Sequence, residues 1–579
     1  MIRQSIVTAE AYYSAVAEYC GVPFLPERSF RPLVINDVVL HCGPGDAGPL
    51  MIGLRNRGPI FVIAPPLDRI ALVRAHLLRH VDWAQNIRIA APESVRQALT
   101  MLKAPTGEIE TRFPEFSARR RISRGQKLGL IAIAMGAALG ALLPATVFLV
   151  LGSFVVGLSC VLTGIARLAG AQATRDAVDS DPCDISAVDE DSALPTYTVL
   201  VPLYKEAQIV RGLLAALERI DYPRERLEIK FLVEQEDVET RLAFAGLVQP
   251  HMEVLVVPLG EPRTKPRALS YGLFTARGEF LTIYDAEDRP EPLQLRKAVA
   301  AFSNAPENLA CLQASLCIDN AGDSFFTRQF AIEYAALFDQ IIPWFSMEAW
   351  PFPLGGSSNH FRRSALIAVG GWDPYNVTED ADLGLRLARF GFTSAALAST
   401  TFEEAPVTWR AWYAQRARWY KGWLQTCFVH LREPSRLWRD LGPRRAIPIG
   451  AMIAGSLLTL AIHPFFFVML YGYALGLWSV PLPGGLLADM IVSLSALAVL
   501  AGYGGTAISS WSAAHRRGFR PRLLDLAGIP LYWLCASAAF YRAVWDFAVR
   551  PHHWHKTEHG TARRRQNIEE SGTDDLDTV

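Results

Sequence analysis

The sequence lacks the features of a secreted or metal-scaffolded protein. Its eight cysteines form no Cys-x-x-Cys pair and show no metal-ligand spacing, so we expect reduced, buried thiols and no disulfide framework. Met1 is followed by Arg3 but by no apolar segment, so we expect no secretory signal. Net charge is also lacking, because 57 basic residues balance 57 acidic ones, and this balance gives no reason to expect a nucleic-acid partner.

Apolar residues are abundant for a chain of which 20% is charged. They make up 51% of the sequence, a share that indicates membrane spans. Two runs, 128–143 and 145–166, contain no charge, and basic residues precede the first and follow the second. This pattern predicts a transmembrane hairpin over 127–167 with both ends cytoplasmic. A buried helical hairpin of a soluble protein is the alternative.

Apolar sequence returns after residue 445, where we expect transmembrane segments over 446–510. The pair His463-Pro464 marks a kink or an interfacial start in this region. In the segment 523–560 we expect an interfacial or re-entrant helix at 526–547, because a single crossing there would place the following arginines outside. The acidic tail, 561–579, is expected to be disordered.

Residues 1–112 have the pattern of a small soluble α/β domain. Apolar runs predict strands at 33–35 and 60–64, and periodic patterns predict helices at 67–78 and 92–102. An acidic linker is expected over 176–191.

Residues 195–440 alternate strand-like and helix-like segments, which predicts an α/β domain with a largely parallel sheet. Strands are expected at 198–202, 228–233, 254–258 and 280–284. In open α/β sheets, ligands bind beyond the carboxyl ends of the strands. We therefore expect one crevice that receives the polar residues following three of these strands: Tyr204, Lys205, Glu206, Glu234, Asp237, Asp285, Glu287 and Asp288.

The last of these strands, within Phe-Leu-Thr-Ile-Tyr-Asp-Ala-Glu-Asp at 280–288, ends in three carboxylates. Carboxylates packed so closely repel one another unless a cation offsets their charge. Hard oxygen ligands suit Mg²⁺ or Mn²⁺, which also bind substrate phosphates, so we predict a metal site at Asp285, Glu287 and Asp288. An acidic turn before Pro290 is the alternative.

Three further signals follow the same order along the chain. Lys265 precedes the helix that leads to the carboxylate strand, the carboxylate pair Glu379 and Asp380 precedes another helix, and Gln-Arg-Ala-Arg-Trp occupies 415–419. Each has a structural alternative. Carboxylates are favoured at helix N-termini in any case, and tryptophans gather at membrane interfaces.

Together these motifs resemble those of processive family 2 membrane glycosyltransferases of the cellulose, chitin and hyaluronan synthase type. The motifs are Pro202-x-Tyr204, Lys265-x-x-Ala-Leu269, the Asp285 cluster, Thr378-Glu-Asp380 and Gln415-x-x-Arg-Trp419, and the resemblance covers about residues 195–560. It implies an α/β catalytic domain of the GT-A (Rossmann-like) class with α-helical transmembrane segments. It also implies a bacterial inner-membrane, multi-pass location in which the catalytic domain and both termini are cytoplasmic.

The resemblance assigns roles to residues. Asp285 and Glu287, with Asp288 sharing or replacing the latter, would hold Mg²⁺ or Mn²⁺, and Asp380, beside Glu379, would be the general base. The nucleotide sugar would be bound by Pro202, Tyr204, Glu206, Glu234, Asp237, Lys265, Asp285, Gln415, Arg418, Trp419, Trp554, Lys556 and Thr557, of which the last three lie in a gating-loop-like segment. The acceptor would contact Trp419 and a flexible glycine-rich loop, 355–360, that contains Gly356, Ser357, Asn359 and His360.

Three positions depart from the family pattern. Lys205 replaces the usual Asn, Glu287 replaces the usual Asp, and Glu234 stands where an Asp commonly contacts the base of the nucleotide. The identity of the nucleotide therefore stays open.

The N-terminal region resembles the corresponding domain of type II secretion ATPases, some of which bind cyclic di-GMP. The Arg-Leu-Gly motif of those binders is not found, so activation by cyclic di-GMP is a hypothesis beside a plain docking or structural role.

The resemblance implies an inverting processive hexosyltransferase that polymerises a β-linked exopolysaccharide from UDP-glucose or a similar donor. The polymer would cross the lipid bilayer and pass to periplasmic or outer-membrane export partners. The alternatives are transfer of a single sugar to a lipid carrier and a non-catalytic receptor for a nucleotide signal.

Overall fold

The structure is a computed structural model. It describes residues 7–26, 38–41, 50–53, 60–65, 69–92, 94–95, 108–140, 145–175, 194–475, 490, 493–494 and 497–552. The chain divides into two compact units. The first comprises residues 1–107, 195–208 and 223–279, and the second comprises 108–194, 209–222 and 280–579. Each is described by itself.

The N-terminal part of the first unit contains a four-stranded sheet of order β1-β2-β3-β4. Antiparallel pairs join β1 (Val38–His41), β2 (Leu50–Gly53) and β3 (Ile60–Ile63), whereas β4 (Ile87–Ile89) is parallel to β3. The strand and the helix expected at 60–64 and 67–78 are present, the helix as α3 (Ile70–Arg79). The strand expected at 33–35 and most of the helix expected at 92–102 lie outside the described residues.

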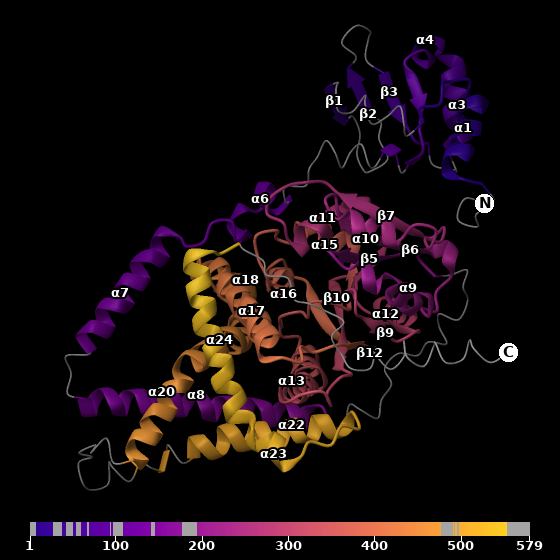
Figure 1. The fold of residues 1–579 in the computed structure, drawn as a ribbon. Helices are drawn as coiled ribbons and strands as arrows, with labels where there is room; N and C mark the ends of the chain where they lie inside the picture. The colour runs from indigo at the N-terminus through magenta and orange to yellow at the C-terminus, as the bar shows by residue number, and fades with distance from the viewer. Residues whose placement is uncertain are drawn as a thin grey trace, which may run out of the picture. The chain divides into compact units, whose positions relative to one another are not determined.

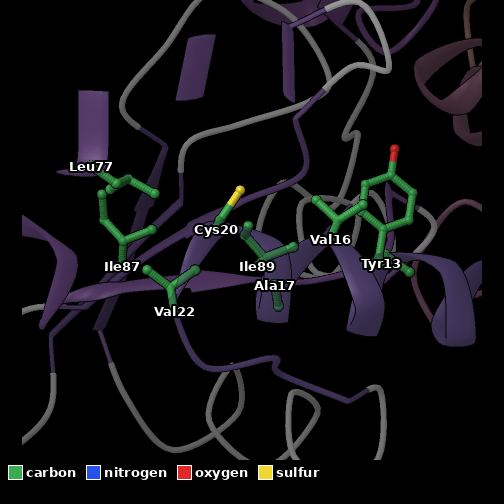
Figure 2. Packing of buried hydrophobic residues seen from close by; sticks show 9 residues of the cluster. Tyr13, Val16, Ala17, Cys20, Val22, Leu77, Ile87 and Ile89 are labelled. Atoms are coloured by element: carbon green, nitrogen blue, oxygen red, sulfur yellow. The ribbon is translucent and has the colours of Figure 1, made fainter. Parts of the chain in front are cut away.

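Helix α1 (Ala9–Cys20) contributes one side of the core of this small domain. Its N-cap is Thr8, whose hydroxyl accepts the N–H of Ala11, and it ends at Gly21 with φ of 69°. Figure 2 shows how buried side chains from α1, from the segment after it, from α3 and from β4 come together: Tyr13, Val16, Ala17, Cys20, Val22, Leu77, Ile87 and Ile89. Cys20 is thus a buried free thiol, as the sequence predicts.

The rest of the first unit is built on three parallel strands of order β7-β6-β5. They are β5 (Tyr197–Leu203), β6 (Leu227–Glu234) and β7 (Met252–Val257), which confirms the strands expected there. Helix α11 (Lys265–Thr275) packs on β5 and β6. A Cβ on its Gly272 would lie 2.9 Å from side-chain atoms of Leu200 and Leu232, so glycine allows this close approach.

The sheet of the second unit is mixed, with the order β8-β11-β10-β12-β9. Its strands are β8 (Phe280–Ile283), β9 (Arg289–Pro290), β10 (Leu309–Ile318), β11 (Asn359–Arg362) and β12 (Thr393–Glu403). The α/β prediction is confirmed, but the largely parallel sheet is not found in this unit. β11 runs antiparallel to both of its neighbours, and only β10 and β12 pair in parallel.

Four helices of the second unit position the residues of interest. They are α13 (Phe325–Ala336), α16 (Glu379–Arg389), α17 (Trp409–His430) and α24 (Ile529–Val549). Helix α24 packs along α17 (Figure 1). It buries Tyr532 and Phe540 against the domain and exposes 66% of Trp545, which is the amphipathic pattern expected of the helix at 526–547.

Helices are also present where membrane segments are expected. Helices α7 (Arg124–Gly140) and α8 (Ala145–Ala173) occupy the predicted hairpin, and Leu128 and Ile133 on α7 are more than two-thirds exposed. Among the described residues, one helix, Pro443–Phe465, is long and apolar enough to cross a membrane. The number of crossings therefore stays a prediction. The expected linker at 176–191, the gating-loop residues 554–560 and the tail 561–579 lie outside the described residues.

Candidate active site

The carboxylates that follow β8 lie in a tight turn of the second unit. Asp288 is 1% exposed, and its Oδ2 accepts the backbone N–H of Asp285 at 2.7 Å. Burial raises the pKa of Asp288 well above its usual range, and the charges of Asp285 and Glu287 raise it further. Asp285 and Glu287 are only half-buried. Asp288 therefore holds the turn from inside, while the other two carboxylates border its surface.

A metal site at this turn would rest on two carboxylates. No group of three His, Cys, Asp or Glu side chains within the described ranges is arranged to hold a metal ion. Mg²⁺ commonly takes only one or two protein carboxylates and completes its shell with water and substrate phosphates. The buried Oδ1 of Asp288 has no hydrogen-bond partner among the described residues and lies in the same turn as the other two carboxylates. Asp285 and Glu287 thus fit a divalent cation.

Helix α16 carries the predicted general base in its first turn. Glu379 is buried and Asp380 is half-buried, and the Oδ1 of Asp380 accepts the N–H of Ala381 at 2.8 Å. The partial positive charge of the helix N-terminus favours both carboxylates. A Cβ added to Gly356 would lie 3.4 Å from Asp380 Oδ2, so this oxygen lies against the glycine-rich loop that precedes β11.

Arg418 on α17 links the two carboxylate groups. Burial lowers the pKa of its guanidinium, and the negative charges of Glu379, Asp380 and Asp285 oppose that effect. Its Nε is buried and has no hydrogen-bond partner among the described residues. The charges of the predicted base and of a predicted metal ligand both act on this half-buried cation, so residues 285, 380 and 418 belong to a single site.

Helix α17 also braces the chain in front of the base. Gln425 Oε1 accepts the N–H of Val377 at 3.0 Å, and Thr426 Oγ1 accepts a bond from the Asn376 side chain at 3.0 Å. A Cβ on Gly422 would lie 2.6 and 2.7 Å from Cγ2 and Cβ of Thr378, the N-cap of α16. The absence of a side chain at 422 therefore allows α17 to approach the start of α16.

The predicted acceptor loop is only partly a loop. Gly356 and Ser357 lie in it, and the loop is fixed where Gly355 N–H donates to Gln313 at 2.7 Å. Asn359 and His360, in contrast, belong to strand β11. The Asn359 side chain donates to Gly355 O at 2.6 Å, so it holds the loop from the sheet.

The prediction that His360 lies in a flexible loop is wrong. Its side chain is fully buried within the sheet, where Nε2 lies 3.2 Å from Gln294 Oε1. Burial lowers the pKa of His360 to about 3, so the ring is neutral in the folded protein.

Trp419 lies in an aromatic cluster. Its ring is stacked on Tyr334 at 6.5 Å between centroids and 13° between planes, and the guanidinium of Arg416 lies 4.6 Å from the ring centre. Gln415 Oε1 is buried and lacks a hydrogen-bond partner within the described part of the chain. Trp412, which the sequence allowed as part of a membrane belt, is fully buried and donates to Tyr532 Oη at 3.2 Å.

The predicted nucleotide residues of the first unit form a network of their own. Asp237 holds the segment after β5, because its Oδ2 accepts the N–H of Lys205, which has φ of 55°. The other oxygen of Asp237 caps α10 (Val238–Ala243) by accepting Thr240 N–H at 3.2 Å. Glu206 N–H donates to Thr240 Oγ1 at 2.9 Å, and Tyr204 Oη donates to a Glu236 oxygen at 3.2 Å.

Glu234, at the end of β6, has a partner that the sequence pattern did not reveal. Arg267 Nη1 donates to both of its carboxylate oxygens at 3.1 and 3.2 Å. Burial raises the pKa of Glu234 and the charge of Arg267 lowers it. Pro202 lies within β5 and Lys265 is the first residue of α11. These residues all belong to the first unit, and their convergence with Asp285 on one crevice stays a prediction.

The family follows from a comparison with known protein families. Residues 280–508 match the model described as glycosyl transferase family group 2, and this range contains the Asp285, Asp380 and Arg418 site. The chain carries a family 2 glycosyltransferase domain.

Curated relatives of the family 2 domain differ in the activities that their names state. The chain is 28% identical over 242 residues to the probable glycosyltransferase YdaM of Bacillus subtilis, which covers 40% of this chain and 55% of that protein. It is 27% identical over 271 residues to a beta-monoglucosyldiacylglycerol synthase of Synechocystis sp., covering 46% and 55%. It is 26% identical over 245 residues to glucomannan 4-beta-mannosyltransferase 2 of Arabidopsis thaliana, covering 40% and 45%. The chain thus spans about half the length of the curated relatives it matches.

Among solved structures, a mannosyltransferase from Pyrobaculum calidifontis in complex with GDP-Man and Mn²⁺ is 19% identical to this chain. The match covers 68% of this chain and 98% of that one, with a TM-score of 0.44.

The second unit also contains a charge network around the buried Arg416 that the motifs did not indicate. Arg416, inside the Gln415–Trp419 motif, donates to both oxygens of Glu333 at 2.9 and 2.7 Å and to Tyr532 Oη at 3.0 Å. The hydroxyl of Tyr532 in turn donates to Glu333 at 2.8 Å. The signal in the sequence was an arginine between apolar and aromatic residues on a helix, which predicts a buried charge with a partner.

Proposed function

We propose that this chain is an inverting glycosyltransferase that transfers a hexose from a nucleotide sugar, UDP-glucose by preference, to an acceptor hydroxyl. The observation that carries the proposal is that the charges of both Asp285 and Asp380 act on the half-buried guanidinium of Arg418, whose pKa they raise against the effect of burial. Transfer requires a carboxylate that accepts the proton of the acceptor hydroxyl. It also requires a carboxylate that binds a cation and a fixed positive charge, both of which stabilise the leaving diphosphate.

The chemistry follows from these positions. Asp380 takes the proton of the acceptor hydroxyl while the hydroxyl oxygen attacks the anomeric carbon of the sugar. A new glycosidic bond forms, the bond to the diphosphate breaks from the opposite side, and the nucleoside diphosphate leaves. Arg418 offers donors and charge to the leaving diphosphate. Mg²⁺ or Mn²⁺, held by Asp285 and Glu287, would supply further charge neutralisation for that group when bound.

We propose a growing polysaccharide as the acceptor in the first place. Helix α17 is followed, after a short helix, by the apolar helix Pro443–Phe465, so the site is close in sequence to a candidate span. Relatives named as glucomannan mannosyltransferases are compatible with a β-linked polysaccharide product. In this reading the chain resides in a bacterial inner membrane, and export partners receive the polymer. Cyclic di-GMP remains a candidate activator of the N-terminal domain.

Transfer of one sugar to a lipid is the second candidate. It is favoured by the similarity to proteins named beta-monoglucosyldiacylglycerol synthase, whose acceptor is a membrane lipid by that name. Both candidates use the same base and the same donor site, and they differ in the acceptor.

The deciding experiment is product sizing with the full chain in lipid vesicles, given Mg²⁺ or Mn²⁺ and a radiolabelled nucleotide sugar, with several donors in parallel. A high-molecular-weight, glycosidase-sensitive product supports the polymerase. A labelled product that extracts with lipid and carries one sugar supports the second candidate. Retained nucleotide binding without incorporation from any donor would contradict both and favour a receptor.

A further inference from the structure

A cavity of about 600 Å³ lies in the second unit, away from the carboxylate site. It is bounded by the segment 108–123 on one side and by the C-terminal ends of α16 and α17 with the following α18 (Pro434–Leu441) on the other. Its charged lining is basic overall, since five arginines face three glutamates. The arginines are Arg119, Arg120, Arg389, Arg432 and Arg436.

Three of these arginines are paired with carboxylates. Arg119 lies 2.6 Å from Glu110, Arg389 lies 2.7 Å from Asp440, and Arg436 lies 3.3 Å from Glu115. The floor is aromatic, because Phe116 is buried between the guanidinium groups of Arg389 and Arg436, at 4.7 and 5.6 Å from its ring centre. These ion pairs and ring contacts therefore hold the three paired arginines in place in the absence of a ligand.

The other two arginines form no ion pair among the described residues. Arg432 donates to the backbone carbonyls of Glu115, at 2.5 Å, and of Ser117, at 2.8 Å, and to that of Arg120. Its Nε is buried with no hydrogen-bond partner in the described part of the chain. Burial lowers the pKa of Arg432 and the neighbouring charge of Arg120 lowers it further, whereas the charges of Asp373, Asp382 and Glu115 raise it. Two like charges crowd here, and an anion between them would relieve both effects.

The cavity also lies beside two helices of membrane character. Ser123 lines it and is followed directly by α7, whose apolar side chains are exposed. On its other side Arg436 precedes the candidate span that begins at Pro443. Basic pockets at the cytoplasmic ends of membrane helices are placed at the level of lipid phosphates.

We propose that this cavity is a binding site for a phosphate group, carried either by an anionic lipid headgroup or by a soluble phosphate, and held by Arg120, Arg432 and Arg436. The bound phosphate ties the segment 108–123 to the ends of α16 and α17. The site is separate from the transfer chemistry, so it exists whichever acceptor the domain uses.

The test uses the full-length chain in a neutral detergent with a chelator present. Isothermal titration calorimetry measures binding of short-chain phosphatidylglycerol, short-chain phosphatidylcholine and inorganic pyrophosphate. The variants are Arg120→Gln, which removes an exposed side chain, and Arg120→Gln/Arg436→Gln. Arg124→Gln is the matched control, because Arg124 belongs to the same basic run but does not line the cavity.

We expect saturable binding of phosphatidylglycerol, pyrophosphate or both, weakened about fivefold by Arg120→Gln and further by the double change, and unchanged in Arg124→Gln. Binding of the lipid alone identifies a headgroup as the source, and binding of pyrophosphate alone identifies a soluble phosphate. Binding that is insensitive to Arg120→Gln, or equally weakened by Arg124→Gln, would overturn the proposal. The first result would place the anion elsewhere, including the carboxylate site, and the second would leave only a diffuse basic surface.

Discussion

Asp380 and Arg418 carry opposite charges within one site, and each can be tested by a change that preserves shape. Asp380→Asn keeps the N-terminal position on α16 but cannot accept a proton. We expect a loss of transfer of at least about a hundredfold, in the range of general-base contributions, with nucleotide binding nearly unchanged. Turnover and nucleotide affinity of the purified chain are the measurements. Asp221→Asn, an exposed site paired with Arg296, serves as the matched control. Equal losses of turnover and nucleotide affinity would refute the base assignment.

The metal assignment is tested at Asp285. Because only Asp285 and Glu287 border the surface of the turn, Asp285→Ala should abolish both activity and the response of nucleotide affinity to added Mn²⁺. Nucleotide affinity with and without Mn²⁺ gives a readout that does not depend on turnover. Asp288→Ala should behave differently. It removes the inward-facing acceptor of the Asp285 N–H, so its main effect should be a lower melting temperature. Full activity of wild-type protein in excess chelator would contradict the metal role.

At the scale of single residues, the sequence predicted which residue types form the site better than it predicted the orientation of their side chains. Asp285, Asp380 and Arg418 follow from motifs whose spacing is local. The inward orientation of Asp288 does not, because it depends on which face of a turn packs against the sheet. The Glu234–Arg267 pair joins residues 33 positions apart, and no periodicity reports such a contact.

At the scale of elements, α17 supports the site from behind. Gly422→Ala would place a Cβ within 2.7 Å of Thr378, so α16 and its carboxylates must shift. We expect destabilisation of about 1–3 kcal/mol and a fall in turnover larger than the fall in nucleotide affinity. Gly125→Ala on α7 is the control, because no atom lies within 4 Å of the position of its added Cβ. A Gly422→Ala protein that melts and turns over like Gly125→Ala would show that α17 does not brace the base.

One hydroxyl on α24 accepts two hydrogen bonds from α17. Tyr532 Oη accepts bonds from Trp412 and Arg416 and donates to Glu333, so Tyr532→Phe leaves the buried indole N–H without its acceptor. We expect a loss of about 1–3 kcal/mol, measured as a lower melting temperature. Tyr413→Phe on α17 removes a hydroxyl with only a 3.5 Å contact and should melt like the wild type. Similar melting temperatures for both variants would mean that the network contributes little.

Strands and helices followed from the sequence where apolar patterns were long. Strand β8 and helix α16 were expected and are present. Strand β11 was missed because only one of its four residues, Phe361, is apolar and because it follows a glycine- and serine-rich segment that predicts a loop. Its antiparallel direction is set by pairing with β8 and β10, which are distant in sequence.

At the scale of the whole molecule, Asp373 ties the chain before α7 to the family 2 domain. Its buried carboxylate accepts bonds from Ser117 Oγ at 3.1 Å and Ala118 N–H at 2.5 Å, both from the segment 108–123. Burial raises the pKa of Asp373 from 3.8 to about 6, and the charge of Asp382 also raises it. The folded state therefore binds this proton more tightly than the unfolded state.

The sign of the pH dependence follows from that difference. Below about pH 4, Asp373 contributes about 3 kcal/mol to the free energy of unfolding. This contribution is lost as the pH rises to about 6, and above that pH the free energy of unfolding no longer changes because of Asp373. Asp373→Asn does not titrate, so the melting temperature of the wild type relative to this variant should fall between pH 4 and 6. Asp221→Asn should show no such trend relative to the wild type. A difference between wild type and Asp373→Asn that is flat or rises over this range would contradict the prediction.

The sequence pattern does not determine the number of membrane crossings, for a physical reason. Helices form wherever apolar residues are continuous, and α7, α8 and Pro443–Phe465 all do so. Whether each crosses a bilayer depends on partners and on charge at both ends, as for α24, whose buried face packs on α17.

The contact between Gly422 and Thr378 has a genetic consequence. Every single-nucleotide missense change in a glycine codon introduces a Cβ, so no one-step mutation at position 422 keeps the spacing that α16 needs. A codon-level mutational scan of the gene should therefore show position 422 as intolerant to every substitution, although it touches no substrate. Selection would act there on spacing alone.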